Sequence, residues 1–169
     1  PISLGFLGIL AGNASGLEGL QMPGKVLPLL FFGFVLVGLS LVQTNNRRTD
    51  EEMSPAQWFL FAATLWLPWV LGGSYLLIHF FHAKGVVANI VDWWFIQNFA
   101  KVYLTFVGLG TLFHFLSALS GRQLVGRGHA QLAFWLLLLF GSVGGVSPGA
   151  PVPAWLPALS TVTAVFYFF

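Results

Sequence analysis

Long apolar runs separated by short polar segments make up most of this chain. Three runs are long enough to cross a bilayer, which takes about 20 mostly apolar residues in an α-helix; they are residues 26–43, 56–81 and 91–118. Stretches such as FWLLLLF do not alternate between apolar and polar residues, as the strands of a membrane β-barrel would. The pattern therefore predicts an all-α, polytopic transmembrane helix bundle.

Shorter apolar runs flank the three long ones and raise the expected number of spans to about four to six. We expect residues 1–11 to be the tail of a span and residues 130–146 to form a short span that breaks at GGVSPGAPVP. The chain should then re-enter the membrane at Trp155. Because both ends of the sequence lie inside apolar runs, we interpret residues 1–169 as a single membrane domain from the middle portion of a longer chain.

The amino-acid composition indicates what surrounds and binds this chain. Apolar residues make up 57% of the chain and charged residues only 7%, whereas a soluble domain carries about 25% charged residues. No basic run of the kind that contacts nucleic-acid phosphates is present in the sequence. With no cysteine, the sequence excludes disulfides and thiolate metal sites. The expected surroundings are a lipid bilayer and other membrane subunits, with no nucleic acid.

The distribution of Lys and Arg predicts the orientation of the bundle. Loops 44–55 and 119–129 together carry four of these residues, and loops 11–25 and 82–90 together carry two. Short loops rich in Lys and Arg remain in the cytoplasm. We therefore expect loops 44–55 and 119–129 on the cytoplasmic side. We also expect the membrane to be a bacterial-type inner (cytoplasmic) membrane.

Local signals predict where the second long span begins and where it bends. Ser54 suits an N-cap and Pro55 suits the first helical turn. Pro68 and the pair Gly72-Gly73 should bend the same helix. The tryptophans, Trp66 among them, are expected mainly near span ends, where indole rings favour the membrane interface.

A polar stripe interrupts the third long span. Gln97, Lys101 and Thr105 are spaced four residues apart and should share one helix face. Since a charge at the bilayer centre costs about 2.5–3.5 kcal/mol on insertion scales, this face should point into protein. Gly108 would continue the face and allow a neighbouring helix to approach closely. The stripe either holds helices together, with Lys101 bonded to carbonyls or to an acid, or serves a function.

Histidines are the other candidate ligands. His79 and His82 are three residues apart at the end of the second span, so both could meet one metal ion or haem edge. The alternative is a solvated pair at the interface. His114 lies deeper in the third span and could contact a haem or a propionate, or act only as a structural hydrogen-bonding group.

Four motifs, in their order along the chain, resemble a known family. They are AGNASGLEGLQMP, NRRTDEEMSPAQWF, VDWWFIQN and AFWLLLLFGSVGGVSPGAPVPAWLPAL. Together they resemble the catalytic subunit I of haem-copper oxidases, closest to the C-family (cbb-type) cytochrome c oxidases and the related nitric oxide reductases. The resemblance implies that this chain is part of a twelve-helix oxidase-like subunit.

The departures from that family fall on its copper ligands, its redox-active tyrosine and the glutamate of the nitric oxide reductases. The resemblance places the three copper-ligating histidines at Gln97, Ser147 and Pro148, the redox-active tyrosine at Gly141, and the nitric oxide reductase glutamate at Lys101. Copper in proteins prefers imidazole or sulfur ligands, and amide or hydroxyl oxygens are poor substitutes. The resemblance therefore implies a degenerate site without copper. Haem remains compatible with the complete chain, with its ligands outside this segment.

Three functions follow as alternatives. The first is a non-catalytic membrane subunit of a respiratory or electron-transfer complex, acting as a scaffold or haem-bearing electron relay beside other subunits such as a cytochrome c. The second is an active terminal oxidase or nitric oxide reductase relative with altered chemistry. The third is a transporter whose polar path is the stripe of Gln97, Lys101 and Thr105.

Overall fold

The computed structural model describes residues 2–12, 16–17, 19–47, 53–121 and 126–167, and over these residues it is helical without strands. Two segments, η1 and η2, have the wider π-helical hydrogen-bond pattern. The elements, in chain order, are α1 Ile2–Leu10, α2 Leu27–Asn46, α3 Pro55–Tyr75, η1 Leu76–Phe80, α4 Val86–Gln97, η2 Asn98–Leu104, α5 Thr105–Ser120, α6 Arg127–Ser142 and α7 Trp155–Tyr167.

Three continuous helices are long and apolar enough to cross a membrane, which confirms the three long runs. They are α2 with 20 residues, Pro55–Phe80 with 26 and Val86–Ser120 with 35. The third begins at Val86, five residues before the predicted start at residue 91. The helices at the other expected spans are shorter: α1 has 9 residues, α6 has 16 and α7 has 13. By length and composition, three helices among the described residues can span a membrane, and the shorter runs expected as partial spans form shorter helices.

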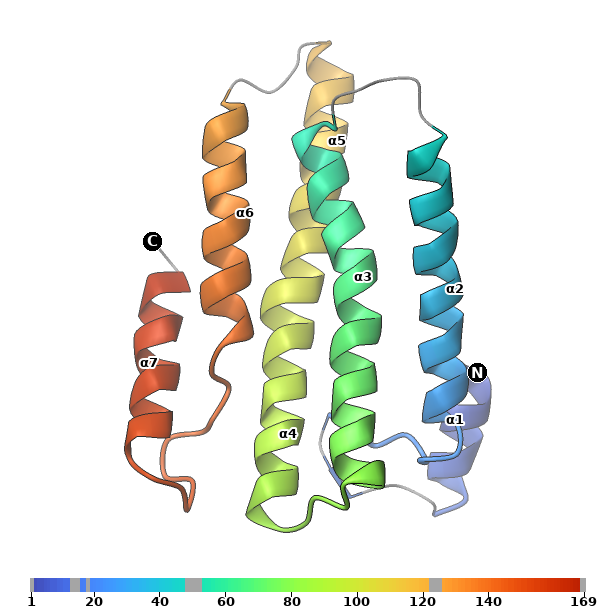
Figure 1. Ribbon diagram of the computed structural model, residues 1–169, viewed down its shortest axis with the longest axis vertical. Helices are drawn as coiled ribbons and strands as arrows, with labels where there is room; N and C mark the ends of the chain where they lie inside the picture. Colours follow the sequence, from blue (N-terminus) through green and yellow to red (C-terminus); the bar gives the residue numbers. More distant parts are fainter. Residues whose placement is uncertain (1, 13–15, 18, 48–52, 122–125, 168–169) are drawn as a thin grey trace.

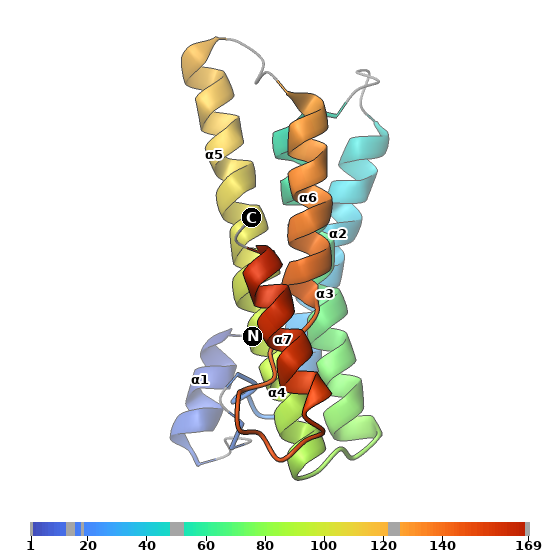
Figure 2. The ribbon, with the colours of Figure 1, turned by 90° about the vertical axis from the view of Figure 1, so that its left-hand side faces the viewer.

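The long helices run antiparallel beside one another, with α3 in the middle (Figure 1). Helix α3 packs against α2, η2 and α5, while α6 packs against α7 and η2. Helix α1 lies on the opposite side of the bundle from α6 and α7 (Figure 1), and in the turned view of Figure 2 it lies beside the lower part of the bundle. This arrangement places the π-helix η2 between the central helix and the C-terminal pair.

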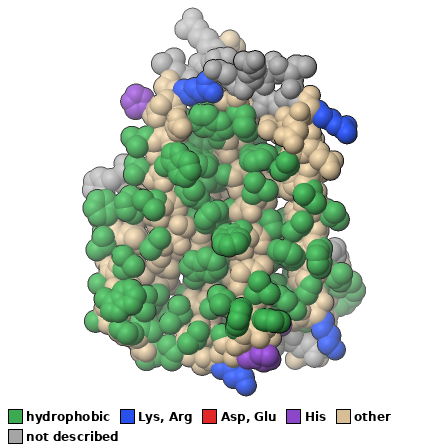
Figure 3. All heavy atoms as spheres, viewed as in Figure 1, with side chains coloured by type: hydrophobic (Ala, Val, Ile, Leu, Met, Phe, Trp, Pro, Cys, Tyr) green, Lys and Arg blue, Asp and Glu red, His purple; other side chains and the backbone are tan. Residues whose placement is uncertain are grey.

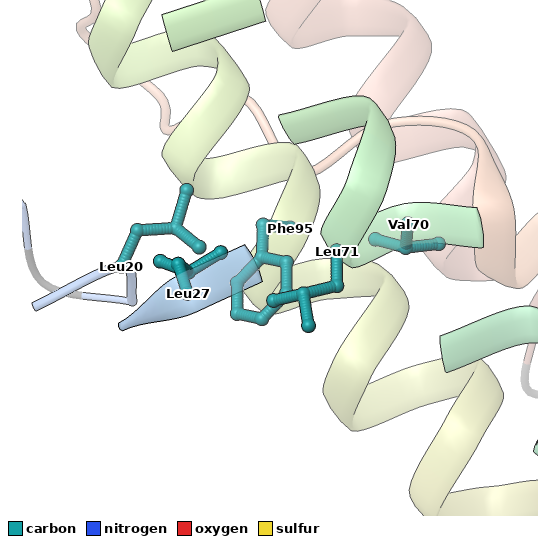
Figure 4. Close-up of a cluster of buried hydrophobic side chains, with 5 residues drawn as sticks. All are labelled: Leu20, Leu27, Val70, Leu71 and Phe95. Carbon is teal, nitrogen blue, oxygen red and sulfur yellow. The ribbon is translucent and has the colours of Figure 1, made fainter. Parts of the chain in front are cut away.

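Two hydrophobic clusters form the interior. One joins Leu20 and Leu27 to Val70, Leu71 and Phe95 (Figure 4). The other lies farther along the bundle and consists of Phe59, Ala63, Val102 and Phe106. In the second cluster the rings of Phe59 and Phe106 meet edge to face at 5.2 Å, a favoured aromatic geometry.

The start of α3 follows the sequence prediction. Ser54 Oγ accepts a hydrogen bond from the Gln57 backbone N–H at 3.4 Å, and Gln57 Oε1 accepts one from the Ser54 N–H at 2.9 Å. This is a capping box, which satisfies two backbone donors at the helix end. Pro68 lies inside α3, which continues past it to Tyr75. The change of helical pattern comes later, in η1, soon after Gly72-Gly73.

The helix ends that flank the two loops richest in Lys and Arg lie at the same end of the bundle, as predicted. Arg127 Nη2 donates to the Met53 carbonyl at 3.4 Å, which joins the segments before α3 and α6. Arg48 and Arg122 lie outside the described residues. Hydrophobic side chains cover the flank in Figure 3, and Lys and Arg side chains appear at its two ends. The structure is therefore that of a membrane-embedded bundle.

Candidate functional site at the π-helix

The π-helix η2 places the polar stripe on the side of the bundle that faces α6 and α7. Gln97, Lys101 and Thr105 are half-buried, while Asn98 and Val102 are fully buried. In an α-helix, four residues turn through about 400°, so a repeat of four drifts by about 40° per step. The wider π turn reduces this drift, and π segments are frequent at functional sites.

Tyr167 of α7 joins two members of the stripe. Its hydroxyl donates to the Lys101 carbonyl oxygen at 2.9 Å and lies 2.8 Å from Thr105 Oγ1. Because the single tyrosine proton is used on Lys101, the Thr105 hydroxyl is the donor in the second bond. Lys101 Nζ lies 5.6 Å from the centre of the Tyr167 ring, within range of a cation–π interaction. Tyr167 was not among the predicted site residues, because nothing local in the final apolar run distinguishes it.

Gln97 meets the segment that follows α6. A Cβ at Gly145 would lie 2.8 Å from Gln97 Cβ and 2.7 Å from the Trp93 carbonyl oxygen, so only glycine allows this approach. Gly145 also has a φ of +92°, which favours glycine. The Gln97 Nε2 atom is buried without a hydrogen-bond partner among the described residues.

The expected copper-site positions are only partly brought together. Gly141 is buried against η2 and α7, where an added Cβ would lie 3.1 Å from Val102 Cγ2 and 3.2 Å from the Tyr167 ring. Gln97, the last residue of α4, is half-buried. Ser147 and Pro148, in contrast, are exposed. The described residues contain no group of three or more His, Cys, Asp or Glu side chains that could hold a metal ion. The amide and hydroxyl groups at these positions do not fit a copper ion.

A buried amide lies behind the stripe and connects three helices. Asn98 is fully buried; its Oδ1 accepts from Trp66 Nε1 at 3.1 Å. Its Nδ2 donates to the carbonyl oxygens of Trp94, at 2.9 Å, and Ser142, at 3.2 Å. Trp66 therefore bonds inside the bundle, and its expected place among the interfacial tryptophans is wrong.

The three histidines that were candidate haem contacts lie away from the polar stripe. His79, on η1, is exposed and its ring lies 4.6 Å from that of Tyr75. The helix ends at Phe80, and His82 follows it with a φ of +54°, so the two imidazoles do not share a helix face. His114 is exposed on the outside of α5. All three side chains are exposed on the surface of the described bundle.

The close helix approach predicted at Gly108 occurs at a different glycine of α5. Gly108 is exposed and has no atom within 4 Å of the position of an added Cβ, so the predicted close approach there is wrong. Gly110 takes that role instead, because a Cβ there would lie 2.7 Å from Leu60 Cγ and 3.2 Å from the Ala56 carbonyl oxygen.

A second buried polar group lies on α4, away from the stripe. Asp92 is 3% exposed, and its carboxylate accepts hydrogen bonds from the backbone N–H groups of Gly19, at 3.1 and 3.2 Å, and Leu20, at 3.0 Å. These bonds hold the segment between α1 and α2 against α4. An acid within an apolar run was the available signal in the sequence, but its partners are 72 and 73 residues away.

No protein-family model, curated protein or solved structure matches this chain. The resemblance to oxidase subunit I therefore stays a prediction. The contacts of the chain's own residues carry the functional interpretation.

Proposed function

We propose that this chain is an integral-membrane subunit of an electron-transfer complex, of the oxidase subunit I type, that works without copper. Its role is that of a scaffold or a haem-bearing electron relay. The observation that supports this proposal is the polar cluster of Lys101, Thr105 and Tyr167. Lys101 occupies the position that the resemblance gives to the nitric oxide reductase glutamate, and Tyr167 packs against Gly141, the position that it gives to the redox-active tyrosine. The cluster therefore offers a cation and hydroxyl groups next to the expected metal site.

In this proposal, the positive charge of Lys101 binds the chain to a neighbouring subunit or to a haem. Among the described residues the only acid is Asp92, whose carboxylate is engaged by the amides of Gly19 and Leu20. The described bundle therefore supplies Lys101 with the face of the Tyr167 ring rather than with an anion. A membrane-buried cation is most stable beside an opposite charge. In our proposal that anion is an acidic side chain of a neighbouring helix or a haem propionate.

Metal and haem stoichiometry of the purified intact complex tests the proposal. Elemental analysis should find no copper bound to this subunit, and a reduced-minus-oxidised spectrum should show whether haem is present. Haem without copper supports the electron-relay role, and the absence of both supports the scaffold role. Copper bound to this subunit would contradict the proposal.

A substitution at Lys101 tests the role of the cation separately. Lys101→Met removes the charge and keeps most of the side-chain volume. We expect it to weaken assembly of the complex or to shift the haem spectrum, whereas the exposed Lys84→Met should change neither. A complex with Lys101→Met that is equally stable and spectrally unchanged would contradict a role for this charge.

A further inference from the structure

An apolar cavity of about 370 Å³ lies on the other side of the bundle from the stripe. Its walls come from the segment before α2, from α2 and α3, and from α4 with η2. The lining includes Leu20, Leu27, Leu30, Leu71, Phe95 and Phe99. Figure 4 shows four of these side chains gathered together, those of Leu20, Leu27, Leu71 and Phe95.

The cavity has a fixed wall. Gly19 and Leu20 line it, and the carboxylate of Asp92 accepts hydrogen bonds from both of their backbone N–H groups. Gly19 also packs so closely on α4 that a Cβ would lie 2.5 Å from Ile96 Cγ1. A buried carboxylate thus holds the segment beside the cavity without filling it.

The cavity lies beside exposed apolar side chains on the outside of the bundle. Phe99 is 37% exposed, and Ala100 beside it is also exposed; both line the cavity. Leu29, next to the lining residue Leu30, is 52% exposed. In a membrane-embedded bundle this flank meets lipid. Cavities with apolar walls stay dry and take apolar occupants, so an acyl chain suits this space better than water.

A cation precedes the part of α2 that lines the cavity. Lys25 is exposed and precedes the lining residue Leu27 by two positions. The imidazole of His79 packs against Gly24, next to Lys25. Lys and Arg side chains at a membrane interface attract anionic lipid headgroups. We propose that this cavity is the binding site of one anionic phospholipid, with an acyl chain between α2 and η2 and its phosphate at Lys25.

Lipid retention tests this site directly. The intact complex is reconstituted with equal amounts of phosphatidylglycerol and phosphatidylcholine, extracted in mild detergent and measured by native mass spectrometry. We expect one phosphatidylglycerol retained per chain. Ala100→Trp should abolish that retention by filling the cavity, and Leu30→Trp should do the same from α2. The matched control is Ala118→Trp, at an exposed alanine of α5 outside the cavity, and it should retain the lipid.

The headgroup contact has its own pair of variants. Lys25→Gln should lower the retention of phosphatidylglycerol about fivefold, the effect of one cation near an anionic headgroup. Lys84→Gln, at the other exposed lysine of the same end, should leave it unchanged. Equal retention of both lipids with no effect of Lys25→Gln would overturn the proposed phosphate contact.

Two results would overturn the site itself. One is an equal loss of lipid in Ala100→Trp and Ala118→Trp, since it would show that retention does not depend on the cavity. The other is a complex that retains no lipid and in which Phe99→Cys cross-links to a neighbouring subunit, since it would identify a protein occupant.

Discussion

At the scale of single residues, the buried polar side chains act as specific connections between helices. Asn98 receives a hydrogen bond from Trp66 and donates to the carbonyl oxygens of Trp94 and Ser142, so one amide links α3, α4 and α6. In a membrane an apolar side chain gains little from leaving lipid for protein, so such polar contacts contribute to helix association.

Replacement of Asn98 should destabilise the bundle. Asn98→Leu leaves the indole N–H of Trp66 without an acceptor in the interior, and a buried unsatisfied donor costs about 1–3 kcal/mol. We expect a loss of this size in the free energy of unfolding, measured by denaturation in mixed micelles. Asn89→Leu, at an exposed asparagine of the same helix, should have little effect. Equal stability of the two variants would refute the bonding role of Asn98.

Asp92 should control the segment between α1 and α2. Asp92→Ala removes the acceptor for the N–H groups of Gly19 and Leu20, and hydrogen bonds to charged groups contribute about 1.5–3 kcal/mol. Exchange of these two amides with deuterium should accelerate at least about tenfold. Asp92→Asn keeps one acceptor oxygen and should give a smaller change. Unaltered exchange in Asp92→Ala would show that the carboxylate does not hold the segment.

At the scale of elements, the π-helix η2 decides which side chains of the longest helix are buried. The buried positions Asn98, Val102, Phe106 and Gly110 follow one another at intervals of four. A uniform α-helix would rotate this series by about 120° over three steps. The wider turn at η2 counters the rotation, and both the buried series and the polar stripe keep their orientation.

The capping box at the start of α3 should have a measurable effect. Ser54→Ala removes the acceptor for the Gln57 N–H and should cost about 1 kcal/mol of stability. In a background of Gln57→Ala the same change should cost less, because the reciprocal contact of the box is already lost. Additive effects of the two substitutions would mean that the side chains act independently.

At the scale of the whole molecule, the apolar flank and the charges at its ends define a membrane protein. The exposed apolar side chains on α2, α5 and α6 would be costly in water but not in a bilayer. Lys25 and Lys84 belong to one end of the long helices, and Arg47 and Arg127 belong to the other. This distribution is the basis of the predicted orientation.

The absence of native cysteine makes that orientation testable by labelling. In oriented vesicles, Lys84→Cys and Arg127→Cys should react with a membrane-impermeant maleimide from opposite sides, with Arg127→Cys reacting from the cytoplasmic side. Phe115→Cys, exposed on the flank of α5, should not react because lipid covers it. Labelling of both end positions from one side would contradict the three-span arrangement.

The sequence by itself determined the helical class, the three long helices and the start of α3. These features depend on the length of apolar runs and on local hydrogen bonds between Ser54 and Gln57. All the residues that produce them lie within one short segment of sequence. It also placed the Lys- and Arg-rich loops at one end, because antiparallel helices joined by short loops alternate in direction.

Only the tertiary structure decided what each polar residue contacts. Tyr167 meets Lys101 across 66 residues, and Asp92 meets Gly19 across 73. The approach expected at Gly108 occurs at Gly110 instead. These contacts depend on the rotation and packing of whole helices, and a π segment changes that rotation. A sequence pattern that assumes uniform α-helical geometry therefore could not predict them.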